Sequence, residues 1–237
     1  MAGFGYDAAV LERFPAIVGG VLHATGLSNG PSRSELRDEY RKEQQEVAAR
    51  LATTPIAELA SIGAWRRTFT GFGVKPTQHR VAAEALLRRL HKKGDIPFIS
   101  TLVDIGNLVS IRHAVPVAVF DQAHVSGRTQ VRFSDGNEPF TDLGAGQPVA
   151  PEPGEVIFVD DDSLVSARRW CWRQSAQSAA GPQTTEALLT VEAVHPEGRA
   201  TVEAAVADLI DLLTRFQSGA AVGSAVLDAT NPTVEFE

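Results

Sequence analysis

The alternation of apolar and polar residues predicts a chain of interspersed helices and strands. Helices are predicted where apolar residues recur every three or four positions, because such residues share one helix face. These segments are 34–52, 54–62, 78–91, 101–111 and 199–216. Short apolar or alternating runs that end at Gly, Pro, Asn or Asp predict strands. The strand segments are 14–22, 115–121, 129–133, 155–160, 166–173, 187–194 and 233–236.

The apolar stretch 97–121 carries Asp104, Asn107 and Ser110 at three-residue intervals. On a helix, residues three apart lie on neighbouring parts of one face, so these side chains form a polar stripe that could line a pocket. Asp104 has an alternative role, because Thr101-x-x-Asp104 fits a capping box at a helix start. Asn107 has no comparable local role, and the pattern leaves it as the first candidate for a functional side chain.

Charge is distributed unevenly along the chain. The net charge is −7, yet residues 65–93 hold eight basic residues and one acid, Glu84, so this segment carries +7 and the remainder −14. Such segregation is typical of a phosphate-binding face, although a solvated helix face remains an alternative. The candidate RNA-binding residues are Arg66, Arg67, Lys75, Arg80, Arg88, Arg89, Lys92 and Lys93. Residues 69–73, with two Phe and two Gly, are predicted to form a flexible loop before the second of the long helices.

Composition narrows the chemistry further. A single cysteine, Cys171, excludes an intramolecular disulfide framework and a multi-cysteine zinc site. The six histidines lack ligand spacing, and Asp160-Asp161-Asp162 is interpreted as a strand-ending turn, so neither a metal nor a cofactor is expected. No apolar run approaches a membrane span and no leader pattern opens the chain, which favours a cytoplasmic protein without membrane or DNA partners.

The segment 168–174 contains two tryptophans within seven residues. On the predicted strand, Trp170 and Trp172 face one side while Cys171 and Arg173 face the other. Their aromatic planes could stack on bases, on a sugar or on an amino-acid ring. They could equally pack in the core. Arg173 and Gln174 add donors for a carboxylate, carbonyl or phosphate.

Motifs throughout the central part of the chain resemble those of one protein family. They are Trp65-Arg66, Phe72-Gly73-Val74-Lys75-Pro76, Leu86-Leu87-Arg88-Arg89, Pro97, Leu102-Val103-Asp104-Ile105-Gly106-Asn107, Pro116, Phe120-Asp121, Arg132, Gly136-Asn137-Glu138-Pro139-Phe140, Asp160 and Trp170-Cys171-Trp172-Arg173-Gln174. Together they resemble the free-standing B3/B4 domain proteins, which are similar to the editing, or tRNA-binding, module of the phenylalanyl-tRNA synthetase beta subunit. The resemblance covers residues 65–194.

The resemblance implies an α/β (α+β) fold with a central, mainly antiparallel sheet flanked by helices in a single domain. Residues 1–64 are expected to form an N-terminal flank, a strand plus helices, that packs on a B3/B4-like domain at 65–195. Residues 196–237 would supply a C-terminal helix and tail. The implied ligand pocket comprises Asp104, Gly106, Asn107, Trp170, Trp172, Arg173, Gln174 and Glu192.

The resemblance also implies contact with the aminoacyl end of tRNA and a pocket for an amino acid such as tyrosine. Asn107 matches the family's pocket asparagine and is the candidate catalytic residue, acting by positioning a water or the substrate. Two family side chains are missing, because a Thr is replaced by Gly106 and a His by Ala118. Arg173-Gln174 take the place of a Gly-Gly segment, and the family's acidic residue is either Glu192 or absent, depending on a two-residue gap.

Three functions are compatible with these residues. The first is hydrolysis of mischarged aminoacyl-tRNA, in which the protein orients a water on an ester that is already reactive. The second is binding of tRNA or another RNA without catalysis, and the third is binding of an amino-acid-like small ligand. The protein is therefore a possible aminoacyl-tRNA deacylase, and it is not expected to be an aminoacylating ligase.

Overall fold

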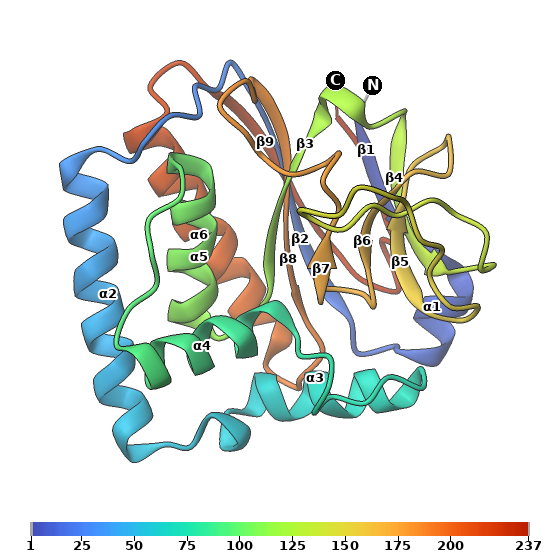
Figure 1. The fold of residues 1–237 in the computed structure, drawn as a ribbon, viewed down its shortest axis with the longest axis horizontal. Coiled ribbons are helices and arrows are strands. Elements are labelled where there is room, and N and C mark those ends of the chain that lie inside the picture. The colour runs from blue at the N-terminus through green and yellow to red at the C-terminus, as the bar shows by residue number, and fades with distance from the viewer. Residues whose placement is uncertain (1, 237) are drawn as a thin grey trace.

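The computed structural model describes residues 2–236 and arranges them in three layers, two sheets and a layer of helices (Figure 1). The middle layer is a four-stranded antiparallel sheet of order β3-β8-β2-β9. Its strands are β2 (Val18–Thr25), β3 (Val117–Asp121), β8 (Glu186–Ala193) and β9 (Ala221–Leu227). Because β3 is an edge strand, its outer side is free to meet other parts of the chain.

A six-stranded sheet of order β10-β1-β4-β5-β6-β7 forms the second layer. Its strands are β1 (Gly3–Tyr6), β4 (Arg128–Phe133), β5 (Val156–Val159), β6 (Val165–Arg168), β7 (Arg173–Gln174) and β10 (Thr233–Glu235). Only β1 and β4 pair in parallel. Between the sheets, the Phe158 ring lies 5.9 Å from that of Phe4 and 5.4 Å from that of Phe120.

Helices cover the other face of the four-stranded sheet. They are α2 (Ser34–Thr53), α4 (Ala82–Lys93), α5 (Thr101–His113) and α6 (Gly198–Phe216). Helix α3 (Ala60–Gly71) runs along the lower end of the molecule in Figure 1, and α1 (Ala8–Arg13) packs beside β4. Helix α6 lies against β2 and β8, and α2 is outermost, against α5 (Figure 1). Gly20 permits this packing, because a Cβ there would lie 2.3 Å from the Val206 Cγ2 atom of α6.

The predicted fold class, an α/β (α+β) single domain, is confirmed, with the strands divided between two sheets. The long helices and most strands lie within a few residues of their predicted bounds. The division at residues 64 and 195 stays a prediction, although β1 and β2 both pair with strands from the middle of the chain. None of the helices in residues 2–236 is long and apolar enough to cross a membrane.

Several local predictions were wrong. Residues 69–71 are the end of α3 rather than a flexible loop, because burial of Ile62, Trp65 and Phe69 outweighs the low helix propensity of two glycines. The strand predicted at 166–173 ends at Arg168. Strands β1 and β9 were not predicted, since their Gly and small residues give little apolar pattern. The α4 helix begins at Ala82, four residues later than predicted.

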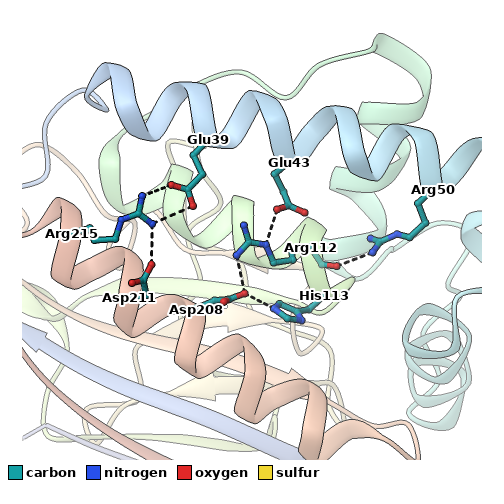
Figure 2. A network of polar contacts seen from close by, with 8 residues as sticks. All are labelled: Glu39, Glu43, Arg50, Arg112, His113, Asp208, Asp211 and Arg215. Carbon is teal, nitrogen blue, oxygen red and sulfur yellow. Dashed lines mark hydrogen bonds and ion pairs between the residues drawn. The ribbon is translucent and has the colours of Figure 1, made fainter.

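An ion-pair network joins helices α2, α5 and α6 (Figure 2). Arg112 of α5 donates to Glu43 of α2 at 2.7 Å and to Asp208 of α6 at 3.0 Å. His113 also contacts the Asp208 carboxylate, at 2.7 Å. Arg215, near the end of α6, donates to Glu39 of α2 and to Asp211 of its own helix.

We expect Arg112→Met to lower the free energy of unfolding by roughly 2 kcal/mol, because Glu43 then loses its cation in a largely buried position. Arg215→Met is the matched control, since Arg215 also bridges two carboxylates but is 44% exposed. Its loss should cost under about 1 kcal/mol. Urea unfolding of both variants measures the difference, and equal losses would contradict the assigned role of Arg112.

Candidate ligand-binding site between the two sheets

Two adjoining cavities lie where the edge strands of the two sheets approach each other. The smaller, the Glu192 cavity, has a volume of about 70 Å³ and the larger, the Asn107 cavity, about 270 Å³; Val117 and Gln174 line both. The Gln174 amide of β7 donates to the backbone oxygens of Val119, in β3, at 2.6 Å and of Ser178 at 2.7 Å. Gln174 therefore ties the two sheet edges together and forms the shared wall.

Glu192 is a buried carboxyl group that contacts no cation. Strand β8 pairs with β3 on one side and β2 on the other, so its alternate residues Thr190 and Glu192 both line the cavity. The Trp170 indole N–H donates to both carboxylate oxygens at 3.1 Å, and the Tyr6 hydroxyl donates to one at 2.8 Å. Burial raises the pKa of Glu192 from 4.5 to about 7, although these two hydrogen bonds oppose the rise.

Tyr6 can reach Glu192 because the residue that lies between their side chains, Gly19, has no side chain of its own. Gly19 of β2 lies directly opposite Glu192 in the sheet, and a Cβ at this position would lie 2.1 Å from the Tyr6 hydroxyl oxygen. Any other residue at position 19 would displace the tyrosine. Burial, and next the Glu192 carboxyl, raise the pKa of Tyr6, so its hydroxyl remains a hydrogen-bond donor at neutral pH.

A tight turn separates the two tryptophans that were predicted to share a strand face. Arg169 and Trp170 adopt left-handed backbone conformations, with φ of +46° and +57°. Two successive non-glycine residues of this kind cost about 1–3 kcal/mol each, and such strain concentrates at ligand sites. The prediction that Trp170 and Trp172 face the same side was wrong, because the turn reverses the chain between β6 and β7.

The turn sends Trp170 into the core and leaves Trp172 at the cavity mouth. Trp170 is fully buried, with its ring 5.3 Å from those of Trp65 and Phe14. The Trp172 ring is half-buried and lies 4.8 Å from the guanidinium carbon of Arg169 and 4.8 Å from that of Arg173. Trp170 therefore belongs to the core and only Trp172 offers an accessible indole.

Helix α5 places Asn107 and Gly106 at the larger cavity and Asp104 outside it. Asp104 is fully buried and accepts hydrogen bonds from the Ile99 backbone N–H at 2.9 Å and from the Ser32 hydroxyl at 2.6 Å. The Asp104 carboxylate therefore binds the backbone N–H of Ile99, which precedes the helix, and not that of Thr101, as a capping box would require. Burial raises the pKa of Asp104.

Asn107 is half-buried and lines the larger cavity. Its side-chain amide lies beside the buried hydroxyl of Tyr40. Burial raises the pKa of Tyr40, whereas the neighbouring Asn107 amide lowers it. Asn107 therefore lies between the Tyr40 hydroxyl and the Asn107 cavity.

Gly106 and Ala118, the two positions where the family resemblance implies polar side chains, lie on facing elements. A Cβ on Gly106 would lie 3.2 Å from the Val119 Cγ2 atom, so the Val119 side chain would have to shift by a few tenths of an ångström to admit one. Ala118 pairs with Thr190 across the sheet, and both line the Glu192 cavity. Thr190 supplies a hydroxyl on the strand next to the position of the missing histidine.

The cavities hold no activated nucleophile. Burial, and then the Glu192 carboxyl, raise the pKa of Cys171, so its thiol stays protonated at neutral pH. No group of three or more His, Cys, Asp or Glu side chains in residues 2–236 could hold a metal ion. The polar groups that remain are carboxyl, amide, hydroxyl and guanidinium, which bind and orient a ligand or a water.

The predicted RNA-binding residues fall into two groups. Arg66 and Arg88 donate to the buried Glu84 carboxylate at 2.6 Å, and Arg80 lies 3.7 Å from it. Three guanidinium groups thus share one acid, which leaves an excess positive charge where α3 meets α4. Arg89 pairs weakly with Asp95 at 3.5 Å. The remaining cations make no ion pair with residues 2–236; they are Arg67, Lys75, Lys92 and Lys93.

Sequence reasoning did not identify Tyr6, Thr190 or Cys171 as cavity residues. Tyr6 lies 186 positions from its partner Glu192, and no local pattern links them. Thr190 and Glu192 interrupt an otherwise apolar strand, which is the same signal that drew attention to Asn107. That signal could have identified both, whereas the cavity position of Cys171 follows only from the turn.

The pKa of Glu192 predicts a pH dependence of stability. A carboxyl whose folded pKa exceeds its unfolded pKa stabilises the fold below pH 4.5, and this contribution is lost as pH rises through 7. We expect unfolding free energy to fall between pH 5 and 8 by roughly 3 kcal/mol more in the wild type than in Glu192→Gln. Chemical denaturation across this range measures it.

Glu138→Gln is the control, because the pKa of Glu138 is lowered to about 2 and its contribution is lost only in acid. Its stability should follow the wild-type pH dependence between pH 5 and 8. Equal slopes for wild type and Glu192→Gln would contradict a buried Glu192 that titrates near neutrality.

Comparison with known proteins identifies a family. The family model of the B3/4 domain matches residues 64–218. The phenylalanine–tRNA ligase beta subunit of Shewanella oneidensis is 29% identical over 99 residues, which are 42% of this chain and 12% of that protein. The chain thus spans about an eighth of this relative.

A solved structure is also similar. The crystal structure of an N-terminal fragment of the phenylalanyl-tRNA synthetase beta subunit from Pyrococcus horikoshii aligns with a TM-score of 0.47 and 11% identity, over 93% of this chain and 50% of that chain. The family match covers more than half of the sequence printed above. The protein belongs to the B3/4 domain family.

Proposed function

We propose that this protein binds tRNA and hydrolyses the ester of mischarged aminoacyl-tRNA. The observation that supports it most strongly is the pair of adjoining cavities between the sheets, with the Asn107 amide in one and the buried Glu192 carboxyl in the other. The family relationship to a tRNA synthetase subunit supports the same substrate. No nucleophile is required, because an aminoacyl ester is already activated toward water.

The Asn107 cavity is the proposed site of the aminoacyl group. Its volume of about 270 Å³ exceeds the roughly 150 Å³ of a protein cavity that admits benzene, whereas the Glu192 cavity is too small for a ring. The lining residues are Ile99, Val103, Gly106, Asn107, Val117, Val119, Leu143, Gln174, Ala179 and Ala180. None of them carries a charge, which favours an uncharged amino-acid side chain.

Hydrolysis then needs a water held against the ester carbonyl. The Asn107 amide can donate to the carbonyl oxygen or accept from the attacking water, which lowers the barrier by positioning. Glu192, with a pKa near 7, lies beyond Gln174 in the adjoining cavity and can accept, through a bridging water, the proton that the attacking water loses as it adds to the carbonyl carbon. The proton passes to the ribose oxygen as the ester bond breaks, which releases the amino acid and intact tRNA.

Binding without hydrolysis is the second candidate. It is favoured by Gly106 and Ala118, which provide no polar group at the two positions where the family resemblance implies a Thr and a His. Labelled tRNA would then be retained without release of the amino acid.

Asn107→Ala should lower the rate of deacylation at least tenfold, because the amide that orients water or carbonyl is lost. The assay is single-turnover release of labelled amino acid, with tyrosyl-tRNA(Phe) and alanyl-tRNA among the substrates screened. Asn231→Ala, an exposed loop asparagine, is the control and should retain full activity. Failure of the wild type to hydrolyse any charged tRNA would exclude catalysis and leave the binding function.

Binding should depend on the cations that make no ion pair. The double variant Arg67→Glu, Lys75→Glu should bind tRNA at least tenfold more weakly and with a shallower dependence on salt concentration, because fewer phosphates are neutralised. Arg41→Glu, Lys42→Glu makes the same charge change on the exposed surface of α2. Filter binding at several salt concentrations compares them, and equal affinities of the two double variants would contradict an RNA interface at α3 and α4.

A further inference from the structure

We propose that the outer edge of β9 pairs with the same edge of a second copy of this chain, which gives a two-fold dimer. The four-stranded sheet would continue through the dimer, with the two β9 strands antiparallel to each other. Strand β9 and the cavity-bordering strand β3 lie at opposite edges of this sheet, so the inference does not rest on the proposed function.

The two sheets have four edge strands, and three of these edges are blocked within residues 2–236. The edge of β3 meets the segment after β7, because the Asp121 N–H donates to the Ser178 oxygen at 2.9 Å. Strand β7 has only two residues, and β10 has three, follows Pro232 and carries Glu235. Strand β9 has seven residues, with no proline, no charge and an unbroken register with β2. It therefore lacks the features that keep edge strands from pairing with other chains.

The edge of β9 presents unpaired backbone groups. Successive residues of a strand direct their N–H and C=O groups to opposite sides. Glu192 of β8 donates its N–H to the Pro116 oxygen, beside β3, so the preceding residue, Val191, bonds to Gly20 of β2. The same alternation, carried through β2 into β9, directs three residues of β9 outward. They are Val222, Ser224 and Val226, and their outer N–H and C=O groups make no hydrogen bond with residues 2–236.

One antiparallel register satisfies all of these groups at once. With Ser224 opposite its own copy, Val222 lies opposite Val226, and each pair can exchange both of its N–H···O bonds. Identical residues meet at a two-fold axis, and here the residue is an uncharged serine. Residues 216–227 contain no charged side chain, so like charges do not oppose each other along the strand. The strand is therefore self-complementary.

Helix α6 provides a side-chain surface next to this edge. Arg199 of α6 contacts Asp228, which directly follows β9, and it also pairs with Glu203 at 3.3 Å. The side of α6 that carries Glu203 therefore lies toward β9, whereas Asp208 lies toward α5. Residues at helical spacing continue this side as one stripe. The α6 stripe consists of Glu203, Ala207, Ile210 and Thr214, all exposed except the half-buried Ile210.

The packing at Gly20 fixes the level of the two-fold axis along α6. A Cβ at Gly20 would meet Val202 and Val206 of α6, and Gly20 pairs with Val226 of β9. The axis lies two residues away along β9, at Ser224, which is about 6.7 Å, or the rise of roughly four to five helix residues. The axis therefore passes near the middle of the α6 stripe.

Around this axis the α6 stripe matches its own copy. Ala207 of one chain lies opposite Ile210 of the other, so a small side chain meets a large one, and Glu203 lies opposite Thr214 rather than opposite another acid. Stable dimers bury about 1,200 Å² or more in total, so the paired strands need such side-chain contacts beside them. An uncharged strand edge and a self-matching helix stripe favour a second copy over a charged partner.

Sedimentation velocity of the full chain at micromolar concentrations tests the proposal, and we expect the wild type to sediment as a dimer. Ser224→Pro should weaken dimerisation at least about tenfold, because proline removes an outward N–H and its ring blocks the approach of a second strand. The Ser224 N–H does not bond to β2, so the circular dichroism spectrum of this variant should match that of the wild type.

Ala207→Glu and Ala204→Glu are matched variants, since each replaces an exposed alanine of α6 by an acid. Ala207→Glu places a carboxylate opposite Ile210 of the second copy, without a cation, and should weaken dimerisation at least about tenfold. Ala204 lies on the face of α6 turned away from the sheet. Ala204→Glu should therefore dimerise as the wild type does.

A wild type that sediments as a monomer would overturn the proposal. So would a dimer that Ser224→Pro and Ala207→Glu leave intact, or one that Ala204→Glu weakens as much as Ala207→Glu does. A complex that forms only with another protein would overturn it as well, since the β9 edge would then have a different occupant. The proposed function is tested separately, because tRNA binding should weaken at salt concentrations that leave an uncharged dimer interface intact.

Discussion

The burial of Glu192 without a cation is the constraint on which the candidate site depends. A carboxyl in this position needs donors from neutral groups, and the chain supplies two, Tyr6 and Trp170. Each donor imposes a further condition. Gly19 must lack a side chain so that Tyr6 can approach, and residues 169–170 must adopt left-handed conformations so that Trp170 turns inward. The N-terminal strand, the central sheet and the turn are thus coupled through one carboxyl group.

The turn at Arg169 and Trp170 positions one tryptophan inside the protein and another at its surface. It directs Trp170 into the aromatic core beside Trp65, and it leaves Trp172 between two arginines at the mouth. Gln174 then joins β7 to the edge of β3 and separates the two cavities. Helix α5 supplies Asn107 to the opposite wall of the larger cavity. The ion pairs of Arg112 with α2 and α6 hold helix α5 in place (Figure 2).

The sequence predicted what depends on local periodicity and missed what depends on distant contacts. Helix α5 and strands β3 and β8 were predicted from apolar patterns, and Asn107 from the absence of a structural role. The Trp170–Trp172 turn could not be predicted, because nothing local marks two left-handed residues that are not glycines. The role of Tyr6 was equally hidden, since it arises from pairing between the two ends of the chain. The sequence also predicted eight basic residues as one RNA-binding set, whereas in the structure three of these arginines share the carboxylate of Glu84.

Protonation of Glu192 inside the cavity is the property on which the candidate site depends most directly. Carbon-13 NMR of protein labelled at the glutamate side-chain carboxyl measures it, with Glu192→Gln to assign the resonance. We predict one carboxyl with a pKa near 7 that disappears in this variant and shifts when an aminoacyl ester analogue is added. A Glu192 resonance that titrates near the usual 4.5 and does not respond to the analogue would contradict the buried carboxyl as the centre of the site.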